Sequence, residues 1–446
     1  AACGWLKNFP PVSKKGWPPV SKKMAPSSRR HLGGGMRGQA VLLVCQILGS
    51  VLLRNAQRAL PGLQRSSSQC WAPELVRLGQ KPVLSYVDGS SDFQQVFNPA
   101  WVAASSGTGG RQGLLVRTQN CSGCTCCVCS GFGQNASRLT FAELLSTDRS
   151  QDTEPRFSRV SPASVVFAPK SELENLGVED PRIVYDEVEK VYHMFYTCYH
   201  QQAEEIYAQI RKVQVCHAYA SDPTRADSWK RQGAVFSSGT KSASVLLRGR
   251  AGGEHLMFYG EGVIKVTKSS SIHRFRFAQG LSKIFMERTL WGASLVEPGP
   301  PPLRLSTGDY VFFINSWDKH FPKPPGYQPG WLVLNGSNPL QIIAQASEPL
   351  WSPSQASWMT GDLPYGCNAK NVAFVSAAHE TETPDTFRLY FGGADAVVGT
   401  AVVRFNKVPG TACFEQSVIS QKALERNKFV KRRGKARSSI LRSEAM

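Results

Sequence analysis

A local pattern that recurs five times is the feature that most restricts the fold of this chain. Each copy has a polar or proline-containing triplet, an apolar run, a turn with glycine or charge, and a second run rich in Leu, Phe or Tyr. Successive triplets are 82, 61, 59 and 71 residues apart. Repeats of this length built from short strands are typical of β-propellers, so we expect an all-β, five-bladed β-propeller. The triplets are 98–100, 180–182, 241–243, 300–302 and 371–373, and the second runs are 114–117, 192–196, 255–259, 310–314 and 387–391.

Local signals between these runs predict shorter elements. An Asn-Gly pair at 335–336, between the strand-like runs 326–334 and 340–346, is a strong hairpin signal. The segments 141–145 and 203–210 are among the few whose composition is compatible with a helix. We therefore expect very little helix.

The net charge of +19 comes from the two ends of the chain. Residues 1–73 hold 11 Lys and Arg and no acid, and residues 421–446 hold 9 against two acids. In contrast, residues 74–420 carry 32 basic and 31 acidic residues. A nucleic-acid-binding protein needs a basic face on its folded part, so this distribution argues against nucleic acid as a partner.

Composition divides the chain into four parts. Residues 1–35 are expected to be a disordered basic arm or leader, 36–70 a signal peptide, anchor or transit segment, 71–420 the propeller, and 421–446 a basic C-terminal tail.

The mostly apolar run 40–53 lies between arginines. Its 14 residues are too few for a comfortable membrane span and fit the core of a signal peptide or a weak signal anchor. An Arg-rich, acid-free leader is also typical of organelle transit peptides. We expect a protein that is secreted or lies in the lumen of the secretory pathway. In a second version of this expectation, 40–53 stays attached and anchors the protein in a membrane. A plastid or mitochondrial location is the alternative.

Five of the 12 cysteines lie within residues 121–129. Cys121 and Cys124 have a Cys-x-x-Cys spacing, but a second ligand pair at the spacing of a zinc finger is missing. We therefore expect disulfides or free thiols on a loop, and nothing in the sequence requires a metal or another cofactor.

The heptad 177–183 places Glu179, Asp180 and Arg182 around Pro181. Proline fixes its own φ and disfavours the helical region for the preceding residue, so we expect a tight, rigid loop rather than a strand. Arg182 can keep one carboxylate ionised while the other, if desolvated, keeps a proton near neutral pH, as a general acid does. An ordinary Asp-Pro turn with a surface ion pair is the alternative.

Three segments stand out as possible family signatures, namely 176–183, 296–302 and 390–395. They resemble, in the same order, the signature segments of glycoside hydrolase family 130, and the resemblance runs from about residue 98 to about residue 404. That family comprises β-mannoside phosphorylases and β-mannosidases built on a five-bladed propeller. The resemblance therefore implies the same fold and an enzyme acting on mannosides.

The resemblance also implies site residues. The general acid of the family maps onto Asp180. Asn and Asp can bond sugar hydroxyls in pairs, and Arg adds a fixed fork of donors. The residues expected to bind the substrate are Asn98, Arg117, Glu179, Arg182 and Asp395.

This chain differs from the phosphorylases of the family in the residues expected around the nucleophile. Where those enzymes carry His-Arg, at the end of the second strand of the third blade, this chain has Tyr259-Gly260-Glu261. A carboxylate repels phosphate, whereas a hydrolase needs one to activate water. Glu261 and Glu297 are therefore candidate general bases. However, Lys241 and Arg304 stand where phosphorylases keep basic residues and would hold phosphate if the enzyme is a phosphorylase.

We therefore expect a glycosidase that removes mannose from β-mannosides with inversion. Its partner would be a mannose-containing oligosaccharide or glycan, and inorganic phosphate only if the enzyme is a phosphorylase. Two alternatives stay open, a phosphate-dependent β-mannoside phosphorylase and a non-catalytic carbohydrate-binding propeller.

Overall fold

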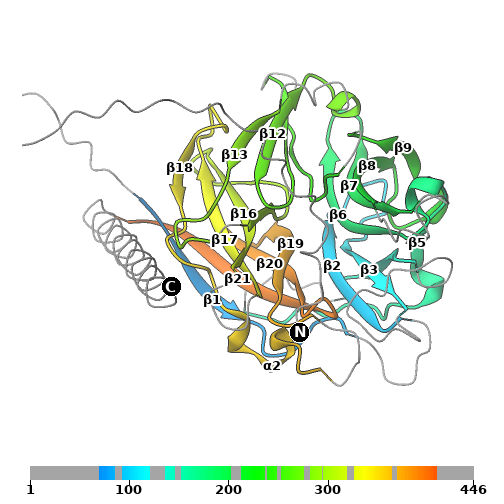
Figure 1. The fold of residues 1–446 in the computed structure, drawn as a ribbon, viewed down its shortest axis with the longest axis horizontal. Coiled ribbons are helices and arrows are strands. Elements are labelled where there is room, and N and C mark those ends of the chain that lie inside the picture. Colours follow the sequence, from blue (N-terminus) through cyan, green and yellow to red (C-terminus); the bar gives the residue numbers. More distant parts are fainter. Residues whose placement is uncertain are drawn as a thin grey trace, which may run out of the picture. The chain divides into compact units, whose positions relative to one another are not determined.

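A computed structural model shows that the described part of the chain is built almost entirely from strands (Figure 1). The longest helix in this part is α2 (Ser357–Thr360), with four residues. The structure describes residues 70–85, 93–120, 136–145, 152–201, 212–236, 239–248, 253–275, 282–293, 295–318, 326–363 and 369–408. The runs 40–53 and 203–210, the cysteines of 121–129 and both predicted tails lie outside these residues.

The strands of the described residues form five antiparallel sheets. Each contains a meander of four neighbouring strands, and the fourth sheet has a fifth strand in addition. The first sheet is β2 (Gln95–Val102), β3 (Gly113–Gln119), β4 (Arg138–Glu143) and β5 (Val165–Phe167). The second is β6 (Gly177–Asp186), β7 (Val191–His200), β8 (Lys212–Ala220) and β9 (Lys230–Ala234). The third is β10 (Ser244–Leu246), β11 (His255–Tyr259), β12 (Ile264–Ser269) and β13 (Lys283–Met286).

The last two sheets each depart from this pattern once. The fourth is β14 (Leu295–Pro298), β16 (Tyr310–Asp318), β17 (Gly326–Leu334) and β18 (Ile342–Gln345), and β15 (Leu303–Arg304) also pairs with β16. The fifth is β19 (Ala373–Glu380), β20 (Thr386–Gly393), β21 (Val397–Val408) and β1 (Cys70–Leu78). Because β1 pairs antiparallel with β21, the first strand of the described chain completes the last blade. This pairing joins the two ends of the propeller.

Five clusters of buried side chains lie between successive blades. Each cluster draws residues from two adjoining sheets, and the one between the fifth and first blades contains Tyr390 and Leu114. A ring of five sheets has five such interfaces, so the clusters confirm the five-bladed propeller. Strands buried on both faces read as nearly continuous apolar runs, which is why the second run of each repeat was legible in the sequence.

Three sequence-based expectations can be checked at the level of single elements. The run 255–259 coincides with β11, and the other four second runs lie inside β3, β7, β16 and β20. However, 141–143 belong to β4 and not to a helix. The hairpin between β17 and β18 also has a seven-residue connection, 335–341, where an Asn-Gly turn predicts two. Asn335 instead accepts hydrogen bonds from the backbone of Ser337 and Asn338.

The prediction that the heptad 177–183 forms a loop is wrong. The structure places this heptad within β6. Its pairing with β7 shifts register between Glu179 and Arg182, so the strand contains a β-bulge that accommodates Pro181.

A disulfide joins Cys198 on β7 to Cys216 on β8, inside the second blade. No helix in the described ranges is both long and apolar enough to cross a membrane.

Candidate active site

At four of the five predicted triplets, one residue has a positive φ. Asn98 and Asp180 have φ values of 45° and 48° and sit in matching bulges of β2 and β6. Ser242 and Asn371, just before β10 and β19, both have a φ of 55°. Positive φ is uncommon outside glycine, and bulges of this kind concentrate beside active sites, where they re-aim a side chain. These four triplets therefore mark one end of the ring as a candidate site, whereas no residue of the triplet 300–302 has a positive φ.

Arg117 on β3 joins the first two blades at this end. Its Nη2 donates to Oε1 of Glu179 over 2.6 Å, and its Nη1 donates to Oδ1 of Asp180 over 3.2 Å. Asn98 adds a 2.9 Å hydrogen bond from Nδ2 to the same Asp180 oxygen. The guanidinium also lies over the ring of Phe97, 4.6 Å from its centroid. All three charged side chains are nearly buried, so this cluster is held rigidly.

Arg182 contributes to the low pKa of Asp180, as the sequence suggested, but less than Arg117 and Lys241, and its hydrogen bonds go elsewhere. It is buried, and its guanidinium donates to the backbone carbonyls of Gly299, Pro181 and Asp180. The guanidinium thus reaches the fourth blade, where Nε donates to the carbonyl of Gly299 over 2.8 Å. Arg182 therefore supports the backbone of the site, and Arg117 holds the acids.

The two adjacent carboxyls have pKa values shifted in opposite directions. Burial alone would raise the pKa of Asp180, but Arg117 and Lys241 outweigh it, so this pKa lies below its usual value. Burial raises the pKa of Glu179, although Arg117 opposes the shift. In the free protein Asp180 therefore binds a proton less readily than Glu179, whereas the acid role that the resemblance implies requires a protonated Asp180.

A second cluster lies around Lys241 and Glu297. The Nζ of Lys241 is 3.1 Å from Oε1 of Glu261. Glu297 is fully buried, and its two oxygens accept hydrogen bonds from Ser242 Oγ (2.7 Å) and Tyr327 Oη (2.6 Å). Burial raises the pKa of Glu297, with Lys241 opposing the shift. In contrast, the Glu261 side chain is 33% exposed, so water reaches Glu261 and not Glu297.

Asp395 completes the site from the fifth blade. It has a φ of 50°, and its carbonyl accepts a 2.9 Å hydrogen bond from Nε2 of Gln95. Burial raises its pKa to about 6, against the opposing effect of Arg117 and together with that of Asp180. Asp395 therefore interacts with the same charges as Asp180.

Arg304 lies away from this group of residues. Arg304 on β15 pairs with Tyr310 of β16. Glu297 on β14 pairs with Asn315, which is five residues further along β16. At the rise of a β-strand this separation is about 17 Å. Arg304 instead lines a cavity of about 710 Å³ with side chains from the opposite ends of the innermost strands. The structure thus does not bring Lys241 and Arg304 together as one phosphate site.

Several polar residues of the site carry no sequence signal of their own. Ser137 donates to Glu179, Gln119 accepts from Arg117, and Tyr327 donates to Glu297. Ser242 could have been found, because it belongs to the repeated triplet 241–243. The others come from second and third strands, and only the pairing register reveals them.

A further constraint comes from Gly392. A Cβ at this position would lie 2.2 Å from Oδ1 of Asn98. This Asn98 oxygen is buried and has no hydrogen-bond partner in the described structure. An acceptor left without a partner in this way is unusual for a buried polar group.

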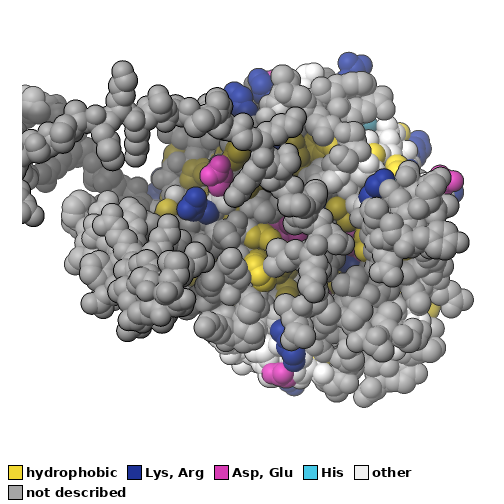
Figure 2. All heavy atoms as spheres, in the orientation of Figure 1, with side chains coloured by type: hydrophobic (Ala, Val, Ile, Leu, Met, Phe, Trp, Pro, Cys, Tyr) yellow, Lys and Arg dark blue, Asp and Glu magenta, His cyan; other side chains and the backbone are white. Residues whose placement is uncertain are grey.

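Acidic and hydrophobic side chains are visible, recessed, near the middle of the face seen in Figure 2. A five-bladed propeller with several buried carboxylates at one end of its ring is a suitable scaffold for an enzyme that acts on glycosides, since such enzymes work with paired Asp and Glu.

The particular family follows from comparison with known proteins. A family model described as beta-1,4-mannooligosaccharide phosphorylase matches residues 138–409, more than half of the chain. The chain therefore belongs to glycoside hydrolase family 130, and it is an enzyme of the kind that acts on mannosides.

Individual relatives are more distant. The chain is 25% identical over 244 residues to a 1,2-β-oligomannan phosphorylase of Thermoanaerobacter sp. (strain X514), covering 54% of this chain and 73% of the relative. It is 25% identical over 232 residues to a β-1,2-mannobiose phosphorylase of the same organism, covering 52% and 68%. A solved structure described as showing that the family contains glycoside hydrolases targeting β-1,2 mannosidic linkages in Candida mannan has a TM-score of 0.55 and 21% identity. It covers 76% of this chain and 95% of its own. At that identity the last likeness supports the fold alone.

Proposed function

We propose that this enzyme hydrolyses β-mannosides with inversion at the anomeric carbon. The observation that carries the proposal is the pairing of Lys241 with Glu261, beside the buried Glu297. The other two cations of the described site, Arg117 and Arg182, are engaged by carboxylates and by backbone carbonyls. A phosphate ion next to Lys241 would face the Glu261 carboxylate. Two like charges about 4 Å apart repel by about 4 kcal/mol at the effective dielectric of a protein surface, which disfavours phosphate relative to water.

Inverting hydrolysis assigns two carboxylates to opposite faces of the sugar ring. Glu261 takes a proton from water while the water oxygen bonds to the anomeric carbon. The bond from that carbon to the leaving oxygen breaks, and the leaving oxygen receives a proton from Asp180, directly or through a hydroxyl of the substrate. Glu261 is the better base of the two candidates because it is open to water, whereas Glu297 is fully buried.

The acid role requires that Asp180 take up a proton with the substrate. Its pKa is low in the free protein because Arg117 and Lys241 are close. A bound sugar excludes water from the carboxyl, and desolvation favours the protonated form. Sugar binding therefore acts in the direction that the mechanism needs.

Substrate recognition would come from groups on two blades. Oδ1 of Asn98 and Nε of Arg117 are buried without hydrogen-bond partners in the described structure, one an acceptor and the other a donor. Asp395 adds a carboxylate. A mannosyl unit, which offers a hydroxyl on most of its carbons, could satisfy all three.

Phosphorolysis is the second candidate, and the names of the relatives favour it. Both Thermoanaerobacter proteins are called phosphorylases, as is the family description. In that reaction phosphate replaces water, and Lys241 would have to exchange Glu261 for the phosphate.

The deciding experiment incubates the protein with β-1,2- and β-1,4-linked mannobiose, with and without phosphate, and follows products by NMR. Phosphate-independent release of α-mannose supports the proposal, and α-mannose 1-phosphate formed only with phosphate rejects it in favour of the second candidate. If sugar raises the melting temperature and no product forms, the protein is a carbohydrate-binding propeller.

A further inference from the structure

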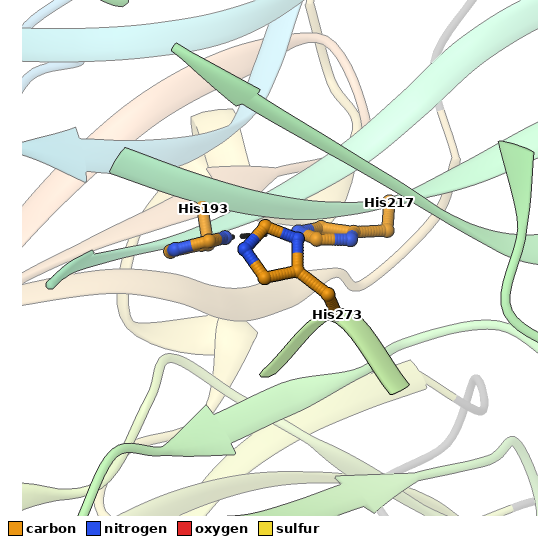
Figure 3. Close-up of side chains that lie close together, drawn as sticks. All are labelled: His193, His217 and His273. Carbon is orange, nitrogen blue, oxygen red and sulfur yellow. Dashed lines mark hydrogen bonds between the residues drawn. The ribbon is translucent and has the colours of Figure 1, made fainter. Parts of the chain in front are cut away.

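Three histidines that are far apart in the sequence meet in the second and third blades (Figure 3). His193 lies on β7, His217 on β8, and His273 just after β12. One ring nitrogen from each lies within 4.8 Å of the other two. Such a group of imidazoles, two of them buried, can hold a metal ion.

The contacts of the ring nitrogens are consistent with metal binding. Nδ1 of His193 is 3.0 Å from Nε2 of His217. The carboxylate of Glu189 is 3.0 Å from Nε2 of His273 and 3.6 Å from Nε2 of His193. If Glu189 keeps protons on these two Nε2 atoms, Nδ1 of His193 and Nδ1 of His273 remain as ligands. A carboxylate behind a ligating histidine is the usual second partner in zinc sites, where it fixes the tautomer.

Glu189 is itself held in place. It belongs to the turn between β6 and β7, where Oδ1 of Asp186 accepts hydrogen bonds from the backbone of Val188 (2.7 Å) and Glu189 (3.1 Å). Lys190 ends the turn with a φ of 55°. The carboxylate therefore reaches the histidines from a defined backbone.

We propose that His193, His217 and His273 bind one Zn²⁺ ion, with Glu189 orienting two of the rings. Zinc-bound imidazole nitrogens at about 2.0–2.1 Å from the metal are about 3.4 Å from one another in a tetrahedral site. The 3.0 Å contact and the 4.8 Å limit lie on either side of that value, so small side-chain rotations suffice.

Ordinary packing explains the cluster less well. The His193 side chain is fully buried, yet its Nε2 has no hydrogen-bond partner in the described structure. A buried polar atom without a partner costs about 1–3 kcal/mol, whereas metal binding would fix the tautomer and draw Glu189 onto this nitrogen. Phe195 stacks on the His217 ring with centroids 4.6 Å apart, which gives the site an apolar wall.

The site is separate from the candidate active site. On β7, His193 pairs with Val184, whereas Thr197 pairs with Glu179. The separation of four positions between His193 and Thr197 corresponds to about 13 Å along the strand. Because His273 belongs to the third blade and the other two histidines to the second, the ion would cross-link two neighbouring blades.

The test uses the untagged full chain, dialysed and then titrated with Zn²⁺ by calorimetry, followed by thermal unfolding. The wild type should bind one ion through this site. The melting temperature should rise on the order of 4 °C when free zinc is a hundredfold above Kd. His273→Asn should abolish both effects, and because its side chain is 30% exposed and outside the strands, the variant should still fold. Glu189→Gln should weaken binding by about 10–100-fold. His379→Asn, a partly buried histidine of the fifth blade, is the matched control and should behave as the wild type.

Two outcomes would overturn the proposal. One is a wild-type chain whose zinc binding and melting temperature equal those of His273→Asn. The other arises if Co²⁺, used as a spectroscopic substitute, gives the near-ultraviolet absorption of cobalt–thiolate bonds, because the metal then binds to cysteines. A histidine site should give tetrahedral cobalt absorption in the visible range only, and this absorption should disappear in His273→Asn.

Discussion

The side-chain amide of Asn98 donates a 2.9 Å hydrogen bond to Oδ1 of Asp180 across the junction between the first two blades. Both residues occupy matching bulges, and both have positive φ. In each blade a bulge with positive φ positions the side chain, so that the Asn98 amide of the first blade faces the Asp180 carboxylate of the second. This contact fixes the Asp180 carboxyl without neutralising it, and several predictions rest on that arrangement.

Replacing Asp180 with Asn should abolish turnover and leave the fold intact. General acid catalysis contributes about 10²–10⁴-fold, so we expect kcat to fall by at least a hundredfold. Asn preserves the shape of the side chain and can still accept from Asn98 and Arg117. The measurement is mannose release together with the far-ultraviolet circular dichroism spectrum. A variant that keeps more than about a tenth of wild-type kcat would exclude Asp180 as the acid.

Glu261→Gln should mainly lower turnover, whereas Glu297→Gln should mainly lower stability. Loss of the general base at Glu261 should lower kcat by about 10²–10⁴-fold with little change in stability. Azide should restore turnover of Glu261→Gln and give α-mannosyl azide, because this nucleophile needs no base. The readout is product identity by NMR, and the Asp180→Asn variant, treated in the same way, is the control.

Glu297→Gln should mainly cost stability. The buried carboxylate accepts one hydrogen bond from Ser242 and one from Tyr327, each on a different oxygen. In glutamine one of these oxygens becomes an amide nitrogen, which cannot accept a hydrogen bond. We expect a loss of about 1–3 kcal/mol in the free energy of unfolding, measured with denaturant. If Glu297→Gln instead loses turnover at unchanged stability and is rescued by azide, the roles of the two glutamates are reversed.

Gly392→Ala should damage the site through Asn98. The added Cβ would meet Oδ1 of Asn98 at 2.2 Å and force that side chain away from Asp180. We expect kcat/KM to fall at least tenfold, with a stability loss of about 1–3 kcal/mol. The neighbouring Gly393→Ala is a matched control, because its Cβ would meet the ring of Trp358 at 2.5 Å. An equal loss of kcat/KM in both variants would show that general overpacking, and not Asn98, is responsible.

The five-bladed architecture was predictable because each blade repeats the same order of triplet, strand, turn and strand. Buried strands also leave long apolar runs in the sequence, as in 255–259, which coincides with β11. The wrong loop at 177–183 shows the limit of such reasoning. Pro181 and Asp180 break the local strand pattern, but the pairing of β6 with β7 on both sides of the bulge keeps the segment in the sheet.

The partners of the site residues were harder to predict. Arg182 is only two residues from Asp180 in the sequence, yet Arg117, 63 residues away from Asp180, makes the ion pair. Which arginine meets the carboxylate depends on the bulge and on contact between two blades, and neither is encoded locally. The same is true of Arg304, whose position along the axis depends on the register of β15 on β16.

The disulfide between Cys198 and Cys216 was not predicted, because only the register of β7 on β8 brings these two cysteines together. It closes a loop of 18 residues, for which the chain-entropy model gives a stabilisation of about 3 kcal/mol. Reducing the folded protein, or replacing both cysteines with Ala, should therefore lower the free energy of unfolding by about that amount. Mass spectrometry of unreduced peptides should find the pair linked if the protein is made in an oxidising compartment, as we propose from the run 40–53. Alkylation of both thiols in unreduced, freshly isolated protein would argue against that location.

Asp395 should make stability depend on pH in a specific window. Its folded-state pKa of about 6 lies above the ordinary value of 3.8. Between these values the folded protein holds a proton that the unfolded chain has released, so the contribution of Asp395 to stability falls as pH rises from about 4 to about 6. Asp395→Asn removes this titration. The variant should match the wild type near pH 4 and exceed it in the free energy of unfolding by about 1–3 kcal/mol above pH 6. Subtracting the two curves cancels the groups that titrate alike in both proteins. A difference that is constant between pH 4 and 8, or that shrinks as pH rises, would contradict the raised pKa.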